Sequence, residues 1–159
     1  MLSTKINHRN APDCLLLIDL QSSFIRESFA GNEEWKSYCL RVQDVAKQFD
    51  HVIAVKFDVS EFSSQLAPFI EDLADHVLVK HDVSAFSDSS LNIVFDRLGI
   101  ESVAIAGLET NVCVLQSFLD AVDAGYDCVI LDDLCRTSCG DEAHDLALLI
   151  MHEYESKLV

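Results

Sequence analysis

The chain has 159 residues, half of them hydrophobic, and its 27 acidic and 11 basic residues give a formal net charge of −16. This length suffices for one hydrophobic core, so we expect residues 1–159 to form a single domain. An acidic surface repels phosphate backbones, which argues against nucleic acid as a partner. No run approaches the roughly 20 apolar residues of a membrane span. The polar start from Met1 to Asp13 has no signal-peptide pattern, so we expect a cytoplasmic protein with no membrane partner.

Short apolar runs alternate with helical patterns along the chain. The predicted strands are Cys14–Ile18, Val52–Phe57, His76–Val79, Ser102–Ala106 and Cys128–Leu131. Several are continuously apolar, which is typical of strands buried on both faces of a parallel sheet. The predicted helices are about Glu34–Gln48, Ser90–Leu98, Asn111–Ala124 and Asp141–Tyr154, and Gly99 is placed to cap the second of them. This order predicts a three-layer α/β fold, Rossmann-like, with a mostly parallel open sheet of strand order about 3-2-1-4-5.

Reactive side chains stand where three of these strands end. Asp19 ends the first apolar run, Lys80 ends the third, and Cys113 follows the fourth at the start of a helix. Open α/β sheets bind ligands at the carboxyl ends of their strands, so we expect the three side chains to meet. A helix N-terminus and a nearby ammonium both favour a thiolate, which predicts a Cys113 pKa below that of a free thiol.

The chemistry of these groups is coherent. A carboxylate at Asp19 can take the thiol proton and later donate it to a leaving amine. Backbone N–H groups in the tight turn before Cys113 can stabilise a developing oxyanion. The sequence therefore predicts a cysteine nucleophile with its own base.

Three sequence blocks carry these residues in order: Leu15–Gln21, Val79–Phe86 and Gly107–Val114. Together they resemble the isochorismatase-like cysteine hydrolases, which include nicotinamidases and N-carbamoylsarcosine amidohydrolase. The resemblance extends from about Leu15 to Ser138 and looks strongest to an isochorismatase-domain subgroup of unknown substrate. It implies a catalytic triad of Asp19, Lys80 and Cys113. It also implies a cis peptide at Leu108–Glu109, with Leu108, Glu109 and Cys113 forming the oxyanion hole.

The chain departs from the nicotinamidase pattern in several places. Nicotinamidases carry a metal-binding Asp-x-His motif, but here Asp58 has no histidine at that spacing, so we expect no metal and no cofactor. Cys135 and Cys139 are four apart but lack a second ligand pair, which disfavours a zinc site. A sixth strand is either missing or reduced to Lys157–Val159. Glu109 places a charge beside the expected oxyanion hole.

Further residues have both a site and a structural interpretation. Gln21, Phe24, Phe86 and Thr110 are predicted to contact substrate, although both phenylalanines could be core and Thr110 could instead be the N-cap of the Cys113 helix. Asp132 and Asp133 follow the fifth predicted strand, where a turn role is favoured. His51, His76, His144 and His152 show no ligand spacing and are interpreted as surface or interface residues.

The prediction is hydrolysis of a small amide or related C–N bond through a thioester on Cys113. Two alternatives from other classes stay open: a catalytically idle binding or scaffold protein, and a protein that uses Cys113 for thiol-redox chemistry. We also expect a homo-oligomer, because the apolar fraction is high for a chain this short and a reduced lid would leave apolar surface near the site.

Overall fold

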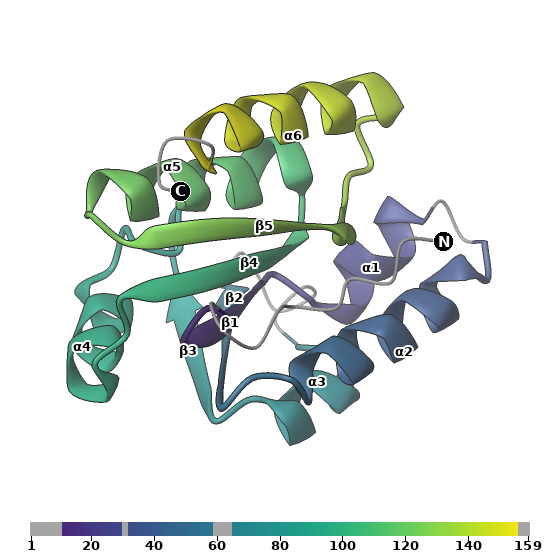
Figure 1. Cartoon of the computed structure of the whole chain (residues 1–159). Helices are drawn as coiled ribbons and strands as arrows, with labels where there is room; N and C mark the ends of the chain where they lie inside the picture. The colour runs from purple at the N-terminus through teal and green to yellow at the C-terminus, as the bar shows by residue number, and fades with distance from the viewer. Residues whose placement is uncertain (1–10, 30–31, 59–64, 156–159) are drawn as a thin grey trace.

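A computed structural model describes residues 11–29, 32–58 and 65–155. Its centre is a 5-stranded sheet of order β3-β2-β1-β4-β5 in which every neighbouring pair is parallel. The strands are β1 (Cys14–Ile18), β2 (His51–Phe57), β3 (His76–Lys80), β4 (Ser102–Leu108) and β5 (Asp127–Arg136). The predicted three-layer α/β architecture and strand order are therefore confirmed (Figure 1).

Helices cover both faces of this sheet (Figure 1). They are α1 (Ser22–Ser28), α2 (Glu34–Ala46), α3 (Pro68–Leu73), α4 (Ser89–Leu98), α5 (Leu115–Asp123) and α6 (Asp141–Glu155), with a π-helical turn η1 (Thr110–Val114) before α5. The four predicted helices correspond to α2, α4, η1 with α5, and α6, and Gly99 ends α4 in a left-handed conformation as expected. Helices α1 and α3 were not predicted, because 7 and 6 residues are too few for a clear period of 3.6.

The alternation of side chains along β1 divides the interior into two cores. Leu16 and Ile18 pack on the face covered by α4, α5 and α6. Leu15 and Leu17 pack on the opposite face, against α1, α2 and α3. All five residues of β1 are fully buried, as the continuous apolar run predicted for a central parallel strand.

Strand β5 is longer than predicted and continues to Arg136 rather than ending at Leu131. Its register against β4 shifts between Ile105 and Gly107, so extra residues of β5 bulge out of the ladder. Asp132 and Asp133 consequently lie within the strand and not in a turn after it, which corrects the prediction. The possible sixth strand at Lys157–Val159 falls outside the described residues.

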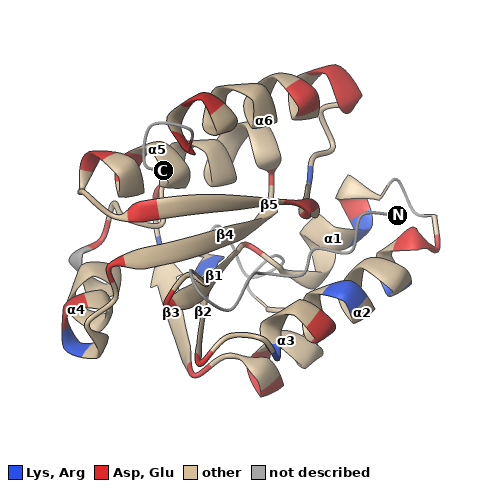
Figure 2. Ribbon diagram, in the orientation of Figure 1, with Lys and Arg blue, Asp and Glu red and all other residues tan. Residues whose placement is uncertain are grey.

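Acidic residues are spread over the helices of both layers and clearly outnumber the basic ones (Figure 2). Among the described helices, none combines the length and the apolar character needed to cross a bilayer.

Candidate active site

Three strands deliver the predicted reactive residues to the carboxyl edge of the sheet. Asp19 follows β1, Lys80 is the last residue of β3, and Cys113 lies in η1 directly after β4. Asp19 Oδ2 is 3.0 Å from Lys80 Nζ, and both side chains are almost fully buried. The Cys113 thiol adjoins both groups closely enough that each shifts its pKa. The structure thus brings together the three residues that the sequence placed at separate strand ends.

Backbone geometry explains why β1 and β4 meet so closely here. Gly107 lies opposite Ile18, immediately before Asp19, and a Cβ at Gly107 would be 2.1 Å from the Ile18 carbonyl oxygen. Gly107 also has a φ of +138°, which residues with side chains rarely adopt. Asp19 itself has a positive φ of 54°, an uncommon conformation that turns the chain away from the strand. Glycine at 107 is therefore required to bring the end of β4 against Asp19.

Lys80 is held in place by several acceptors. Its ammonium donates to the carbonyls of Asp82 at 3.1 Å and Val83 at 2.7 Å, in addition to its 3.0 Å contact with Asp19. The ring of Phe57 lies 4.6 Å from Nζ on a further side. These three oxygen acceptors fix the ammonium in place, and the Cys113 thiol is a further hydrogen-bonding neighbour of Lys80. Lys80 can therefore influence the site by its fixed positive charge.

The two acidic groups of the site are controlled by burial. Burial raises the pKa of Asp19 above its usual range, and the attraction of Lys80 offsets this only in part. The pKa of Cys113 is raised to about 12, chiefly by burial and also by Asp19, while Lys80 acts to lower it. The predicted lowering of the Cys113 pKa is therefore wrong, because desolvation of the thiolate outweighs the favourable charge. The resting thiol keeps its proton at neutral pH.

Asp19 is also the residue placed to receive that proton. Its buried Oδ1 atom accepts no hydrogen bond of ordinary geometry within the described part of the chain. The adjoining Cys113 thiol and the main chain of Phe57 both lower the pKa of this carboxyl, so they favour its charged form. A buried carboxylate of raised pKa is a stronger base than a solvated one, which suits proton transfer from a thiol.

The main chain at Cys113 is fixed by a serine that sequence reasoning missed. Ser117 Oγ donates to the Cys113 carbonyl at 2.6 Å and accepts the N–H of Ala85 at 2.8 Å. Ser117 thereby connects the cysteine turn to the loop after β3, which also carries the acceptors of Lys80. The available signal was a serine one turn after Cys113 on a helix face that is otherwise apolar.

The turn between β4 and Cys113 has the backbone that the family resemblance implied: the Leu108–Glu109 peptide is cis. Glu109, and not Thr110, occupies the N-cap position of η1. Thr110 is fully buried, and its Oγ1 lies 2.9 Å from Nδ1 of His144 on α6. The N-cap interpretation of Thr110 is therefore wrong, and His144 is an internal partner rather than a plain surface residue.

Comparison with known proteins agrees with this fold and shows the family of the chain. The isochorismatase domain family matches residues 13–158. The chain belongs to the isochorismatase domain family. Isochorismatase domain-containing protein 2 of Xenopus laevis is 27% identical over 126 residues, which cover 77% of this chain and 60% of the relative. This isochorismatase domain thus spans less than two thirds of that relative's length.

Two solved structures show the same fold at low sequence identity. YcaC of Escherichia coli, an octameric hydrolase of unknown specificity, has a TM-score of 0.75 and 21% identity, covering 89% of this chain and 72% of YcaC. The pyrazinamidase of Pyrococcus horikoshii, solved in complex with zinc, has a TM-score of 0.74 and 19% identity, covering 91% of this chain and 97% of the pyrazinamidase.

The predicted substrate-contacting residues occupy different surroundings. Gln21 is fully buried, and its amide both donates to the Phe57 carbonyl and accepts the Phe57 N–H, at 3.1 and 2.8 Å. Half-buried Phe24 packs against the core under α1, α2 and α3. Phe86 packs on the other core, with ring centroids 5.8 Å from both Phe95 and Tyr126. Gln21 and Phe86 therefore have structural contacts in this isochorismatase domain, and their contact with substrate stays a prediction.

No group of three or more histidine, cysteine or acidic residues suited to a metal is found in the described ranges. Asp58, which lacks the histidine of the nicotinamidase motif, has exposed His81 of the next strand end nearby, with 3.8 Å between Oδ2 and Nε2. Cys135 is buried and Cys139 exposed, so the sequence spacing of this pair does not translate into a shared environment.

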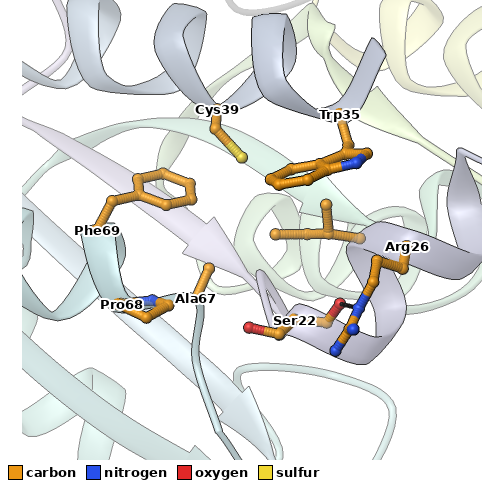
Figure 3. Close-up of a pocket in the computed structure, with 8 residues that line it drawn as sticks. Ser22, Arg26, Trp35, Cys39, Ala67, Pro68 and Phe69 are labelled. Carbon is orange, nitrogen blue, oxygen red and sulfur yellow. Dashed lines mark hydrogen bonds between the residues drawn. The ribbon is translucent and has the colours of Figure 1, made fainter. Parts of the chain in front are cut away.

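A separate apolar cavity of about 260 Å³ lies between α1, α2 and α3 (Figure 3). Trp35 and Cys39 of α2 face Pro68 and Phe69 of α3 across it, and Arg26 of α1 stands at one side (Figure 3). Asp19, Lys80 and Cys113 do not line this cavity, so it is distinct from the candidate active site.

Proposed function

We propose that this isochorismatase domain is a cysteine hydrolase that cleaves a C–N bond of a small amide or related molecule. The observation that carries this proposal is the convergence of Asp19, Lys80 and Cys113, from three separate strands, at one buried edge of the sheet. A pyrazinamidase and a hydrolase among the structural neighbours are consistent with this reaction class.

In the proposed reaction, Cys113 Sγ attacks the substrate carbonyl carbon while its proton passes to Asp19. Backbone N–H groups of Cys113 and the preceding turn hold the oxyanion, with the fixed charge of Lys80 beside them. The amine leaves with the proton from Asp19, and a thioester remains on Cys113. Asp19 then takes a proton from water, whose oxygen attacks the thioester; the acid departs and the proton returns to the thiol.

A panel of small amides, assayed for ammonia release, tests this function. We expect at least one amide to be hydrolysed, and mass spectrometry of a rapidly quenched reaction to find the acyl group on Cys113. Cys113→Ala removes the nucleophile and should abolish turnover, whereas Cys39→Ala, which changes another partly buried thiol, serves as the matched control. Ammonia release that survives Cys113→Ala would contradict the thioester mechanism.

One observation favours the alternative of an idle binding protein. Burial raises the pKa of Cys113, as it raises that of Cys39, so without a working base the Cys113 thiol would be as unreactive as an ordinary buried thiol. A brief iodoacetamide pulse followed by peptide mapping separates the two possibilities. Faster labelling of Cys113 than of Cys39 indicates activation by Asp19, and slower or equal labelling supports the idle protein.

We also infer a homo-oligomer. Leu146 and Leu149 are about 60% exposed and lie one turn apart on α6, and Val112 is exposed in the adjoining turn η1. Apolar groups of this size next to a site commonly mark a protein interface, and the structurally similar YcaC is octameric. Light scattering should give a mass of two or more chains, which Leu149→Glu should reduce. A wild-type monomer at high concentration in moderate salt would refute the assembly.

A further inference from the structure

Glu109, Thr110 and Asn111, which precede Cys113 in the turn, are each bound to residues 137–144, a segment made of the connection after β5 and the first turn of α6. The Glu109 carboxylate accepts the N–H of Ser138. Thr110 Oγ1 is 2.9 Å from His144 Nδ1. Asn111 Oδ1 accepts the hydroxyl of Thr137 at 2.6 Å. Among the described residues, the layer of α1, α2 and α3 makes a single side-chain hydrogen bond to these three residues, from the Ser28 hydroxyl to the Glu109 carboxylate.

These bonds act on the part of the chain that aims the nucleophile. The Glu109 carbonyl accepts the N–H of Val114, five residues later, at 3.2 Å, so the turn is wound more widely than an α-helix. The same carbonyl accepts the N–H of Val112 at 3.1 Å, a tighter bond over three residues. The direction of the Cys113 side chain follows from that winding. A small change in the winding of this turn would move Cys113 Sγ relative to Asp19 and Lys80. A displacement of about 1 Å between reacting groups can slow an enzymatic reaction about 100-fold.

The Thr110–His144 pair is the most buried of the three connections. Thr110 is fully buried, so its hydroxyl depends on a protein partner, and His144 supplies one. Burial and the nearby Arg136 lower the pKa of His144, which keeps its imidazole neutral at pH 7. A neutral ring can accept the Thr110 hydroxyl proton at Nδ1 while Nε2 carries the ring proton.

We propose that His144 is a positioning residue for Cys113, which acts by fixing Thr110 and through it the winding of the cysteine turn. This inference rests on the proposed function, because it assigns His144 a part in the reactivity of that same site. His144 does not contact the reacting atoms, and its effect should be on the rate of nucleophilic attack.

The probe for this role is 4-nitrophenyl acetate, which requires no knowledge of the natural substrate. Cys113 Sγ forms a bond to the acetyl carbon, 4-nitrophenolate leaves, and the thiol proton passes to Asp19. Absorbance follows the burst of nitrophenolate, and peptide mapping confirms acetyl-Cys113. We expect His144→Ala to slow acetylation of Cys113 by about 10-fold, a fraction of what a 1 Å displacement can cost.

Two further variants separate positioning from stability. His144→Asn retains a polar side chain able to bond Thr110 and should restore the rate to within about 3-fold of wild type. His152→Asn is the matched control, since His152 also lies on α6 and bonds Asp132 at 2.9 Å and Glu155 at 2.7 Å, remote in sequence from η1. It should leave acetylation unchanged even if it lowers the melting temperature as much as His144→Ala does. Thr110→Val combined with His144→Ala should be no slower than the slower single variant, since both remove one bond.

The outcomes distinguish the two proposals. If wild-type protein is not acetylated at Cys113, the proposed function fails and the positioning role fails with it. If wild type is acetylated but His144→Ala reacts at the same rate, or if His152→Asn slows the reaction equally, the positioning role alone is overturned. If His144→Ala does not fold, Thr110→Val, which removes the hydroxyl that contacts His144, is compared with Thr110→Ser, which keeps it. Acetylation that is as fast in Thr110→Val as in Thr110→Ser would overturn the positioning role.

Discussion

The two ends of β1 each carry an aspartate, and the two are used in opposite ways. At the amino end, exposed Asp13 accepts hydrogen bonds on Oδ2 from the N–H groups of Glu101 and Ser102 and from the Ser102 hydroxyl, all at 2.9 Å. At the carboxyl end, Asp19 is 2% exposed and has one oxygen paired with Lys80 and the other without an ordinary partner among described residues.

The pKa of each carboxyl follows from these surroundings. Slight burial acts to raise the pKa of Asp13, but its hydrogen bonds lower it more, so the net direction is downward. Burial dominates at Asp19 and moves its pKa upward. The hydrogen-bonded carboxylate of Asp13 connects β1 to β4 and stabilises the fold. The carboxylate of Asp19 is buried and has fewer hydrogen bonds, so it can more readily take up a proton.

Asparagine at each position should separate these two uses most strongly. Asp19→Asn removes the proposed base, and we expect amide hydrolysis to fall by about 1,000-fold, within the range known for general bases. Asp13→Asn removes only a strand connection, so the turnover per folded molecule should stay near wild type. Initial rates with a substrate found in the amide panel, normalised by the folded fraction from circular dichroism, give the comparison. An equal loss of turnover in both variants would contradict the assignment of a structural role to Asp13 and a catalytic role to Asp19.

The glycines near the two ends make a second contrast. Gly107→Ala would place a Cβ 2.1 Å from the Ile18 carbonyl oxygen, in the ladder that leads to Asp19. We expect it to lower the free energy of unfolding by more than about 3 kcal/mol. Gly99→Ala meets nothing within 4 Å but must adopt a φ of +69°, so about 1 kcal/mol is expected. Urea unfolding of both variants measures the difference, and a Gly107→Ala loss no larger than that of Gly99→Ala would contradict the close approach of β4.

Lys80 contacts both Asp19, whose pKa is raised, and the Cys113 thiol, and we expect its replacement to have a smaller effect. Its charge is the group that lowers the pKa of Cys113 against burial. Lys80→Met should therefore slow iodoacetamide labelling of Cys113 by about 10-fold, which corresponds to one pKa unit. Because a lone buried carboxylate destabilises a fold, the double variant Lys80→Met with Asp19→Asn is the control for folding. Labelling of exposed Cys139 should be unchanged in both, and an unchanged rate at Cys113 would remove Lys80 from the mechanism.

Much of this arrangement could be predicted from the sequence. Strand ends are visible as the ends of apolar runs, and parallel topology brings such ends to one edge, so Asp19, Lys80 and Cys113 could be placed together. The extent of burial could not be predicted, because it depends on residues distant in the chain that pack over the site. The sign of the Cys113 pKa shift was therefore wrong. The partners of Glu109 and Thr110 were also hidden, since Ser138 and His144 reach them only after β5 bulges and α6 folds back.

The smallest expected effect is the pH dependence of stability, in which the two aspartates should have opposite signs. The pKa of Asp13 is lowered on folding, so its contribution is present above the unfolded value near 3.9 and is lost as pH falls through the folded pKa. The pKa of Asp19 is raised, so its contribution is present below that unfolded value and is lost as pH rises through the folded pKa. Below about pH 4, the free energy of unfolding should therefore rise less steeply with pH in Asp13→Asn than in wild type. Above about pH 4, it should rise more steeply in Asp19→Asn than in wild type. Because Asp13 is exposed, the change in the free energy of unfolding in Asp13→Asn should stay below about 1 kcal/mol. Urea unfolding at a series of pH values on both sides of about pH 4 measures how the free energy of unfolding changes with pH. These pH values lie below the titration of His152, because Asp132 and Glu155 raise the pKa of that imidazole against the effect of burial. Slopes that change in the same direction would show that burial does not distinguish the two ends of β1.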